Sequence, residues 1–233
     1  MRNDLSIYDT VEPWWDPADR RFAPLRALAP ARMAYLDRNG LSVAGQVVLD
    51  VGCGGGFMTA PLAAAGGEVI GVDIAQGALD AAALQLAAHG LSAELRLGEG
   101  ASLPVQTDSI DLAVCTDVLV HVPDPRAVVL EIGRVLRPGG VLLVSTINRT
   151  WLSRLVMITL GEDLLRLVHR GTHDPAKFIR PEALSAWLGE GGMALAGLEG
   201  VGPVWIDRRG RLTFGRHPTT AVMVQGHARA GEH

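Results

Sequence analysis

The feature that most constrains the fold is an apolar run that ends in a cluster of glycines, Val48-Leu-Asp-Val-Gly-Cys-Gly-Gly-Gly56. Such a run is typical of a buried strand, and glycines permit a tight turn in which the backbone approaches a ligand closely. A second apolar run, Val69-Ile-Gly-Val72, ends at Asp73. The pattern predicts a strand–turn–helix unit that binds a nucleotide-like ligand at the free N–H groups of the helix. Asp73 is placed to accept hydrogen bonds from two ribose hydroxyls.

The spacing of the glycines indicates which ligand to expect. Gly52, Gly54 and Gly56 form G-x-G-x-G, whereas a dinucleotide-binding turn has G-x-G-x-x-G. Asp50, close to the first glycine, would repel a pyrophosphate but suits the ammonium and sulfonium groups of S-adenosylmethionine. In this respect the turn resembles that of class I methyltransferases. We therefore expect an S-adenosylmethionine site and disfavour a nicotinamide- or flavin-dependent oxidoreductase; the plain alternative is a glycine-rich turn that binds nothing.

From Val47 onward, apolar strands alternate with helical segments, which predicts a mainly parallel sheet with helices on both faces. We expect strands at 47–51, 69–73, 93–97, 110–115, 141–146, 193–200 and 219–226. Helices are expected at 30–39, 56–65, 75–89, 125–136, 150–168 and 181–188. The fold class is α/β: a Rossmann-like class I methyltransferase fold with seven strands, of which the last two form an antiparallel pair.

The chain is expected to form one α/β core with additions before, within and after it. The expected segments are an N-terminal helical or lid segment (1–45), the S-adenosylmethionine-binding core (46–149), a lid or membrane-contacting insert (150–180), the C-terminal part of the same domain (181–226) and a disordered tail (227–233).

Composition excludes several classes of protein. The 233 residues are 48% hydrophobic and 20% charged, as in ordinary globular domains. The net charge of −4 argues against nucleic acid as a partner, because a phosphate backbone favours a basic surface. Cys53 and Cys115 are expected to be buried thiols rather than a disulfide or a zinc site. Because the N-terminus lacks the apolar core of a signal peptide and no run is long enough to span a bilayer, we expect a cytoplasmic location.

Two further positions belong to the expected cofactor site. Ile74, which follows the ribose-binding acid, would pack on the adenine. Glu99 lies in Gly98–Pro104, a loop that resembles the one after the third strand of class I methyltransferases. Glu99 is there a candidate acceptor for the adenine amino group, and the alternative is a solvated loop acid.

The segment Cys115–Pro125 leaves the fourth strand beside this site, where open α/β sheets collect ligand groups. It contains the candidate catalytic residues Asp117 and His121. His121 could take the proton from a phenol while Asp117 orients the imidazole, and the resulting phenolate would be the better nucleophile. The alternative is that His121 only caps a turn.

Beyond the glycine motif, three blocks of sequence resemble one family, the O-methyltransferases of ubiquinone biosynthesis, which act at the 2-polyprenyl-6-hydroxyphenol and 3-demethylubiquinol steps. The blocks are Trp14-Trp-Asp16 with Phe22-Ala-Pro-Leu25, Ser145-Thr-Ile-Asn-Arg-Thr150, and Gly171-Thr-His-Asp-Pro-Ala-Lys-Phe-Ile-Arg-Pro181. The resemblance covers roughly residues 8–190. By match to the family's motif, Arg32, Gly52, Asp73 and Thr116 are expected to contact the cofactor, and the Arg32 guanidinium can pair with its carboxylate.

One position departs from the family's usual Glu-x-x-Glu-His pattern. The chain reads Asp117-Val-Leu-Val120-His121, so Val120 stands where the second acid would be. In family members reported to need magnesium, the two acids and the histidine are the proposed ligands. Asp117 and His121 with water would bind magnesium weakly at best, so we expect no metal site. The change is compatible with a different phenol as substrate or with neutral drift.

The insert from Ser153 to Lys177 combines an apolar face with cations, which suits the surface of an anionic bilayer. Its basic residues are Arg154, Arg166, His169, Arg170, His173 and Lys177. In the resembling family this region is thought to be a membrane-contacting lid, and the alternative is a helix that packs on the domain. Trp15, His173 and Lys177 are assigned to the lid or the substrate side, with His173–Asp174 as a substrate-side or loop-ordering pair.

These patterns predict an S-adenosylmethionine-dependent O-methyltransferase acting on a small hydroxylated aromatic, a quinone precursor of the ubiquinone type. One alternative keeps the chemistry but takes a soluble phenolic metabolite. Another is a non-catalytic cofactor-binding subunit of a membrane-associated complex, against which Asp117 and His121 count. Peripheral contact with the inner face of an anionic membrane is expected, whereas the sequence carries no signal for oligomeric state or prenyl chain length.

Overall fold

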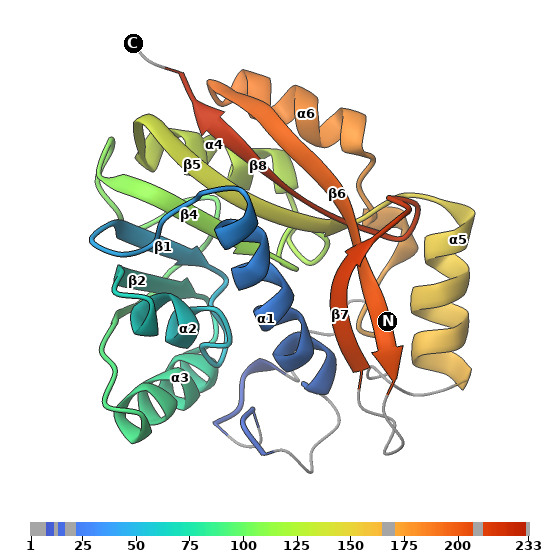
Figure 1. Ribbon diagram of the computed structural model, residues 1–233, viewed down its shortest axis with the longest axis horizontal. Helices are drawn as coiled ribbons and strands as arrows, with labels where there is room; N and C mark the ends of the chain where they lie inside the picture. The colour runs from blue at the N-terminus through green and yellow to red at the C-terminus, as the bar shows by residue number, and fades with distance from the viewer. Residues whose placement is uncertain (1–7, 12–13, 17–21, 165–170, 207–211, 232–233) are drawn as a thin grey trace.

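The computed structural model describes residues 8–11, 14–16, 22–164, 171–206 and 212–231 (Figure 1). Within these residues an eight-stranded sheet has the order β3-β2-β1-β4-β5-β8-β6-β7. The strands are β1 (Val47–Val51), β2 (Glu68–Asp73), β3 (Glu94–Leu97), β4 (Ile110–Thr116), β5 (Leu136–Ile147), β6 (Met193–Ile206), β7 (Leu212–His217) and β8 (Met223–Ala230). The first five pair in parallel, whereas β8 is antiparallel to both β5 and β6, and β7 is antiparallel to β6.

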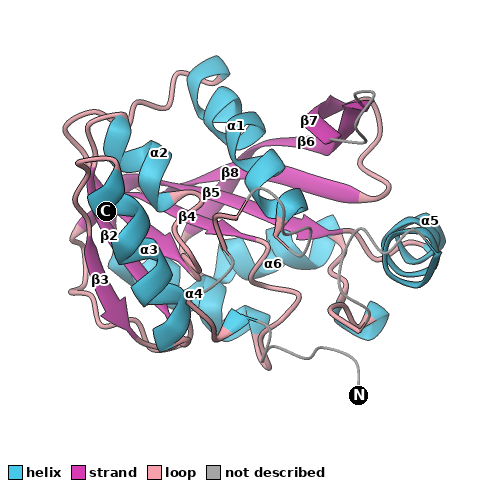
Figure 2. Cartoon of the chain, turned by 90° about the horizontal axis from the view of Figure 1, so that it is seen from below, coloured by secondary structure: helices cyan, strands magenta, loops and turns pink. Residues whose placement is uncertain are grey.

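Helices cover both faces of the sheet (Figure 2). They are α1 (Ala23–Arg38), α2 (Thr59–Ala64), α3 (Gln76–Ala88), α4 (Pro125–Val135), α5 (Trp151–Ser153), the π-helix η2 (Arg154–Leu164), the 3₁₀ turn η3 (Pro175–Lys177) and α6 (Pro181–Glu190). Apolar side chains of α1, α2 and α3 form the core on one face, and those of α4 and α6 form it on the other. The sheet is therefore buried on both sides, which explains the continuous apolar runs of its parallel strands.

The register of the parallel strands brings the predicted site residues to one edge of the sheet. Val51 lies opposite both Val72 in β2 and Cys115 in β4, and Cys115 lies opposite Val144 in β5. The residues that follow these positions therefore leave the sheet side by side, at the carboxyl ends of the strands. This is where open α/β sheets bind ligands.

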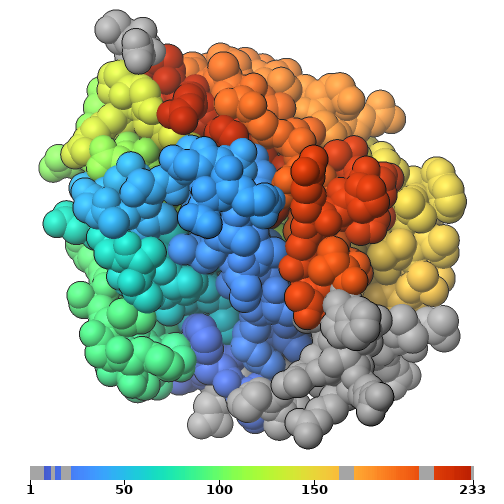
Figure 3. Space-filling model, in the orientation of Figure 1, coloured from blue at the N-terminus to red at the C-terminus, as the bar shows by residue number. Residues whose placement is uncertain are grey.

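The predicted α/β class I methyltransferase fold is confirmed, with eight strands rather than seven in the part of the chain described. The added strand is β7, which pairs with an extension of β6 beyond the predicted end at residue 200 and packs against α1 (Figure 3). Helix α1 starts at Ala23 rather than Pro30, because Pro24 occupies its first turn and Pro30 is accommodated inside it.

The prediction of a disordered tail from residue 227 is wrong as far as Ala230. β8 runs from Met223 to Ala230, four residues later than the predicted strand 219–226. Polar side chains on both sides of the predicted boundary between strand and tail have partners inside the fold. His227 Nδ1 lies 2.9 Å from the Tyr35 hydroxyl, and Gln225 donates to Glu199 at 2.8 Å. Long-range hydrogen bonds thus make a polar sequence acceptable as an interior strand.

The segment expected as one helix over 150–168 begins as a single α-helical turn and continues as a π-helix to Leu164. Thr150 caps the start, because its side chain accepts a hydrogen bond from the Ser153 N–H at 3.0 Å. The part of the prediction at 165–168 lies outside the described residues. Among the helices that the structure describes, we find none with the length and apolar character needed to cross a membrane.

Candidate active site

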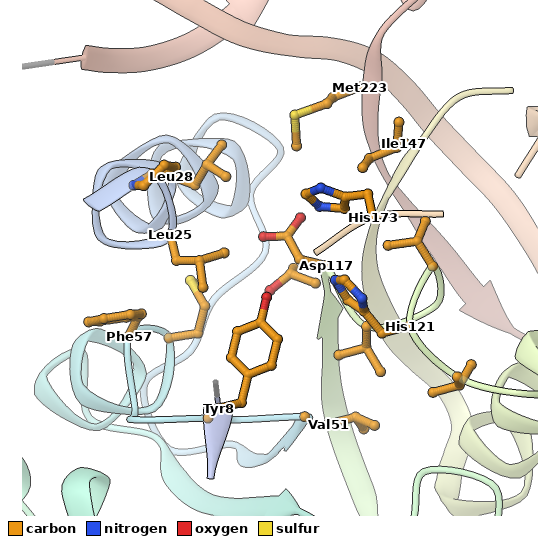
Figure 4. Close-up of a pocket in the computed structure, with 18 of the residues that line it drawn as sticks. Tyr8, Leu25, Leu28, Val51, Phe57, Asp117, His121, Ile147, His173 and Met223 are labelled. Carbon is orange, nitrogen blue, oxygen red and sulfur yellow. The ribbon is translucent and has the colours of Figure 1, made fainter. Parts of the chain in front are cut away.

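One large cavity, of about 1170 Å³, opens at the carboxyl ends of β1, β2, β4 and β5. Its lining includes the glycine turn after β1, the segment after β4 and parts of α1, η2 and β6. Figure 4 shows Tyr8, Asp117, His121 and His173 gathered at its centre, with apolar side chains around them. Most of the residues predicted from sequence to act on a cofactor or a substrate therefore line one cavity.

The glycine turn lies beneath the indole ring of Trp14. A Cβ on Gly55 would come within 2.5 Å of that ring, and a Cβ on Gly54 within 2.8 Å. Trp15, expected to belong to a lid, donates its indole N–H to the Gly55 carbonyl at 2.6 Å. The third glycine of the motif, Gly56, faces Ala82 of α3 rather than the cavity, and it allows the turn to pack closely on that helix.

Gly52 needs to be glycine on two grounds. Its φ of +68° lies in the left-handed region, and a Cβ there would meet Val118 at 2.3 Å. The segment after β4 therefore packs directly on the glycine turn, which brings Thr116 and Asp117 next to that turn. Thr116, an expected cofactor contact, lines the cavity.

Asp73, the predicted ribose acceptor, also orders the turn. One carboxylate oxygen accepts from the Gly54 N–H at 2.8 Å and the other from the Ala75 N–H at 2.9 Å. Burial raises the pKa of Asp73, and these backbone hydrogen bonds oppose the shift. Beside it, Ile74 lines the cavity with 59% of its surface exposed, and Glu99 lines the same region from the loop after β3. Asp73, Ile74 and Glu99 thus lie together in the part of the cavity where the sequence predicts the ribose and the adenine to bind.

Asp50 is almost completely buried at the end of β1 and accepts a hydrogen bond from the Thr59 hydroxyl at 2.7 Å. Burial raises the pKa of Asp50 to about 6, with a further contribution from Asp73, while Thr59 and Arg32 oppose the shift. A nearby cation would stabilise the ionised form of this carboxyl group, because it would offset the free-energy cost of burying the negative charge.

Arg32 reaches the cavity from α1 and pairs with Asp117, and the same guanidinium donates to the Ser145 hydroxyl at 3.3 Å. Asp117 has a left-handed backbone with φ +61°, so the chain turns sharply to present its carboxylate. The carboxylate accepts hydrogen bonds from the Arg32 guanidinium and the Ser145 hydroxyl. This corrects the expectation that Asp117 orients the His121 ring. Among the described residues, Arg32 Nε is buried without a hydrogen-bond partner. This buried donor can receive a ligand's carboxylate.

His121 lies further along the same segment, with its ring edge-on to that of Tyr8 at a centroid distance of 5.9 Å. Burial lowers the pKa of His121 to about 4; His173 and Lys177 add to the shift, and Asp117 and Glu162 oppose it. Burial also raises the pKa of Tyr8, so both side chains are neutral near pH 7.

Lys177 was expected to be a cation of the lid, but it points inward. Its ammonium group donates to the carbonyl of His121 at 3.1 Å and to that of Val122 at 3.4 Å. Lys177 therefore fixes the loop that carries His121, and it also lines the cavity.

His173 lines the cavity as expected, but its partner is Glu162 rather than Asp174. His173 Nδ1 lies 2.9 Å from a carboxylate oxygen of Glu162, whereas Asp174 accepts from the Ala176 N–H at 3.0 Å and caps η3. The rings of His173 and His121 are 5.4 Å apart. Sequence reasoning missed Glu162, whose one signal was an acid within an apolar helical stretch.

Comparisons with known proteins show which family the chain belongs to. A model of the methyltransferase domain matches residues 49–144. A protein named ubiquinone biosynthesis O-methyltransferase from Methylococcus capsulatus is 42% identical over 190 residues, which cover 81% of this chain and 79% of that protein. A protein of the same name from Azoarcus sp. is 39% identical, covering 83% of this chain and 82% of its own length. The chain belongs to the ubiquinone biosynthesis O-methyltransferase family.

Solved structures share the fold of this family member at low sequence identity. A SAM-dependent methyltransferase from Aquifex aeolicus superposes with a TM-score of 0.66 at 17% identity, covering 97% of this chain and 98% of that one. The magnesium protoporphyrin IX methyltransferase of Synechocystis, solved with bound SAH, superposes with a TM-score of 0.63 at 20% identity, covering 91% and 86%. The resemblance to the ubiquinone biosynthesis family drawn from sequence blocks is thus confirmed, together with the fold.

A magnesium site of the kind reported for some ubiquinone biosynthesis O-methyltransferases does not fit these residues. Val120, where the second acid of the motif would stand, is buried with 2% of its surface exposed. Asp117, the remaining acid, is neutralised by the Arg32 guanidinium, which would repel a cation. Within the described part of the chain, no group of three or more metal-ligating side chains is present.

The rest of the cavity is mainly apolar, with His217 and Thr219 as polar side chains near the end of β7. It extends away from the glycine turn between α1, η2 and the β6–β7 hairpin. Its lining there comprises Leu25, Leu28, Ile147, Leu152, Val156, Met157, Val201, Phe214, Val222 and Met223. Apolar walls with a few convergent polar groups are typical of small-molecule sites.

Proposed function

We propose that this protein transfers a methyl group from S-adenosylmethionine to a hydroxyl of a small aromatic molecule, a quinone precursor of the ubiquinone type. The observation that carries the proposal is the single cavity. It runs from the glycine turn past His121 and His173 into an apolar region. A cofactor at one end would face an aromatic hydroxyl near the imidazoles, while the apolar walls would accept an apolar substituent. Membership of the ubiquinone biosynthesis family supports the same substrate class.

The cofactor end has the groups that S-adenosylmethionine requires. Asp73 would hold the ribose, Ile74 and Glu99 the adenine, and Asp50 the cationic part of the methionine moiety. The buried, unpartnered Nε of Arg32 would meet its carboxylate, which supports the fit. Bound there, S-adenosylmethionine supplies an activated methyl group, and its sulfonium charge is lost on transfer. The protein mainly has to align the two molecules and remove a proton from the hydroxyl.

The substrate end would hold an aromatic ring among apolar side chains, with neutral His121 and Tyr8 close to its hydroxyl groups. His121 is a hydrogen-bonding partner for the hydroxyl in this arrangement, and Asp117 contributes by holding Arg32. Trp14 would close over the cofactor as part of the N-terminal segment, since it already covers the glycine turn. We assign no step to a metal, because Val120 stands where the second acid would be and the Arg32 guanidinium pairs with Asp117.

The outer side of the insert is proposed to touch an anionic membrane. Trp151 is 77% exposed and Leu155 39%, with Arg154 exposed between them. Apolar side chains beside a cation favour a bilayer surface, and a cation there contributes about 1 kcal/mol. Of the other cations assigned to this face, Arg166 and Arg170 lie outside the described residues, and Lys177 points inward.

Sedimentation with vesicles of anionic phospholipid at low salt tests the membrane contact. The double variant Trp151→Ala, Arg154→Glu should leave the vesicles while retaining turnover of a short, soluble phenol. Leu84→Ala is the matched control, because Leu84 is 64% exposed on α3, away from the insert. If the wild type does not sediment with the vesicles, the insert is only a lid, and a soluble phenolic substrate becomes the better proposal.

The decisive experiment for the reaction is transfer of a labelled methyl group to a panel of acceptors. The panel contains a simple catechol, a prenylated catechol and a demethylated quinol. We expect the highest kcat/KM for the prenylated acceptors, because the apolar walls would bind the added chain. Equal use of the simple catechol would favour the soluble-phenol alternative. Tight binding of S-adenosylhomocysteine without transfer to any acceptor would favour a non-catalytic subunit, and tighter binding of NAD would overturn the cofactor assignment.

A further inference from the structure

We propose that Tyr8 determines which of two neighbouring hydroxyl groups on the aromatic acceptor receives the methyl group. Its phenolic hydroxyl would bind the oxygen that is not methylated and so turn the other oxygen toward the cofactor. The inference rests on the proposed methyl transfer and adds no chemical step to it, because Tyr8 keeps its proton. Tyr8 was not among the site residues predicted from sequence; it precedes the block Trp14-Trp-Asp16.

The Tyr8 hydroxyl projects into the cavity without a hydrogen-bond partner. Tyr8 lines the cavity, and in Figure 4 its hydroxyl end points toward Asp117 at the centre. Among the described residues we find no hydrogen bond made by this hydroxyl. Polar groups inside proteins are nearly always hydrogen-bonded, so a hydroxyl left open in a binding cavity indicates a partner on the bound molecule.

Aromatic neighbours hold the ring of Tyr8 in place. Its centroid lies 5.9 Å from that of Trp14 and 6.1 Å from that of Phe22. The His121 ring stands edge-on to it, at 5.9 Å. Trp14 is itself stacked on Phe22, with the two ring centroids 4.1 Å apart. Aromatic rings at these distances attract one another, so the hydroxyl of Tyr8 is presented at one place in the cavity.

The backbone that carries Tyr8 is anchored to the start of α3, close to the expected ribose and adenine site. Asp9 accepts a hydrogen bond from the Gly77 N–H at 3.0 Å. A Cβ on Gly77 would lie 2.7 Å from the Thr10 nitrogen, so the segment packs on α3 where a glycine leaves room for it. The Trp14 indole N–H donates to the Thr10 carbonyl at 2.8 Å. A hydroxyl held in this way can discriminate between two orientations of a bound ring.

The chemistry of methyl transfer decides which oxygen Tyr8 binds. The hydroxyl is a neutral donor near pH 7, since burial raises the pKa of Tyr8 and the charges of Asp117 and Glu162 add to the shift. A hydrogen bond to the attacking oxygen would weaken as that oxygen gives up negative charge to the methyl group, and it would slow the transfer. A hydrogen bond to the neighbouring oxygen has no such cost. Val120, which also lines the cavity, offers that second oxygen no hydrogen-bonding side chain.

The test compares Tyr8→Phe with Tyr35→Phe, since Tyr8 and Tyr35 are the two tyrosines of the chain. Both changes remove one hydroxyl and keep the ring, but the Tyr35 hydroxyl lies 2.9 Å from His227 Nδ1, inside the fold between α1 and β8. The acceptors are an alkyl catechol, whose two hydroxyls differ, and the matching phenol without the second hydroxyl. We would measure the ratio of the two monomethyl ethers, kcat/KM for each acceptor, and the affinity for S-adenosylhomocysteine.

Wild type should form one ether in large excess, and Tyr8→Phe should lower the ratio of the two ethers about three- to tenfold, the effect of losing one neutral hydrogen bond. The kcat/KM for the catechol should fall by the same factor. For the phenol it should not change, because the phenol lacks the oxygen that Tyr8 binds. Tyr35→Phe should keep the wild-type ratio, and both variants should bind S-adenosylhomocysteine like the wild type. An unchanged ratio in Tyr8→Phe, or an equal loss of kcat/KM for catechol and phenol, would overturn the inference.

A second variant keeps the hydroxyl and disturbs its support. In Gly77→Ala the added Cβ would meet the Thr10 backbone and displace the segment that carries Tyr8, so the ratio of the two ethers should fall. Gly189→Ala is the control, because its added Cβ meets no atom within 4 Å, and it should keep the wild-type ratio. A wild-type ratio in Gly77→Ala would refute the fixed placement on which the inference depends.

A binding measurement separates this inference from the proposed function. In calorimetry with the S-adenosylhomocysteine complex, wild type should bind the catechol more tightly than the phenol, and Tyr8→Phe should reduce that preference about three- to tenfold. If wild type transfers a methyl group to neither acceptor, the proposed function fails, and the calorimetry still decides whether Tyr8 recognises the second hydroxyl. An equal preference in wild type and Tyr8→Phe would show that it does not, and a failure to bind either acceptor would overturn both proposals.

Discussion

Asp50→Asn should remove the pH dependence with which the free protein binds S-adenosylhomocysteine. Asp50 is buried beside Thr59, and burial raises its pKa to about 6 in the free protein. The ligand's ammonium group would hold the carboxylate ionised, so binding lowers this pKa. The protein then binds the ligand when Asp50 is ionised and not when it is protonated. The affinity for S-adenosylhomocysteine must therefore fall as the pH drops through about 6.

The size of the effect follows from this pKa. With a pKa of about 6, roughly 90% of Asp50 is ionised at pH 7 and roughly 10% at pH 5. The affinity of the wild type should therefore fall about tenfold between pH 7 and pH 5, or about 1.4 kcal/mol. Asp73 and Arg32 also face Asp50, so the informative quantity is the difference between wild type and Asp50→Asn.

Titration calorimetry in buffers of different ionisation enthalpy measures both consequences. Wild type should release close to one proton per ligand bound at pH 5 and close to none at pH 7. Asp50→Asn should bind more weakly than wild type at pH 7, with an affinity that changes little down to pH 5. A wild-type affinity that is equal at the two pH values, or a variant that keeps the tenfold fall, would refute the idea that Asp50 titrates beneath the ligand's cation.

Three shorter predictions address other parts of the site. Asp73→Ala should weaken S-adenosylhomocysteine binding by about 1–3 kcal/mol in calorimetry, the cost of leaving ribose hydroxyls without a buried acceptor, and an unchanged affinity would contradict the assignment. Gly55→Ala should displace Trp14 and lower the affinity for S-adenosylhomocysteine. The control variant Gly189→Ala, whose added Cβ meets no atom within 4 Å, should bind the ligand like the wild type; equal affinities of the two variants would show that Trp14 can move without weakening binding. Excess chelator should leave methyl transfer largely intact because Val120 offers no metal ligand, and loss of activity that magnesium restores would reveal ligands from elsewhere.

The parallel half of the fold could be predicted because each of its inner strands coincides with a continuous apolar run in the sequence. β1, β2 and β4 lie inside the sheet with helices on both sides, and their predicted ends differ from the observed ones by a residue at most. β8 could not be placed in the same way, since His227 and Gln225 become acceptable in the interior only through Tyr35 and Glu199, which lie far away in sequence. β7 carries no such run and pairs only with the extended end of β6.

In the candidate site, too, the features that depend on local sequence could be predicted, and those that depend on partners brought together by the fold could not. The glycine turn and Asp73 could be identified from spacing, because these residues act through local backbone geometry. The pairing of Arg32 with Asp117 joins residues 85 positions apart, and that of Glu162 with His173 depends on how η2 folds back over the strand ends. Sequence proximity suggested Asp117 for His121 and Asp174 for His173, and the three-dimensional arrangement gave both histidines different surroundings.

The position of β8 has a consequence for the order in which the chain can fold. β8 follows every other strand in sequence, yet it lies between β5 and β6 in the sheet. During synthesis the β6–β7 hairpin therefore emerges from the ribosome before β8, the strand that joins it to the sheet, and β5 keeps one side unpaired until β8 is made. Closure requires the last strand to enter between two elements that are already present, a non-local step that is slow and exposes unpaired edges. The wall that the β6–β7 hairpin adds to the cavity is consequently the last part to be assembled, after the glycine turn and its neighbours have had time to form.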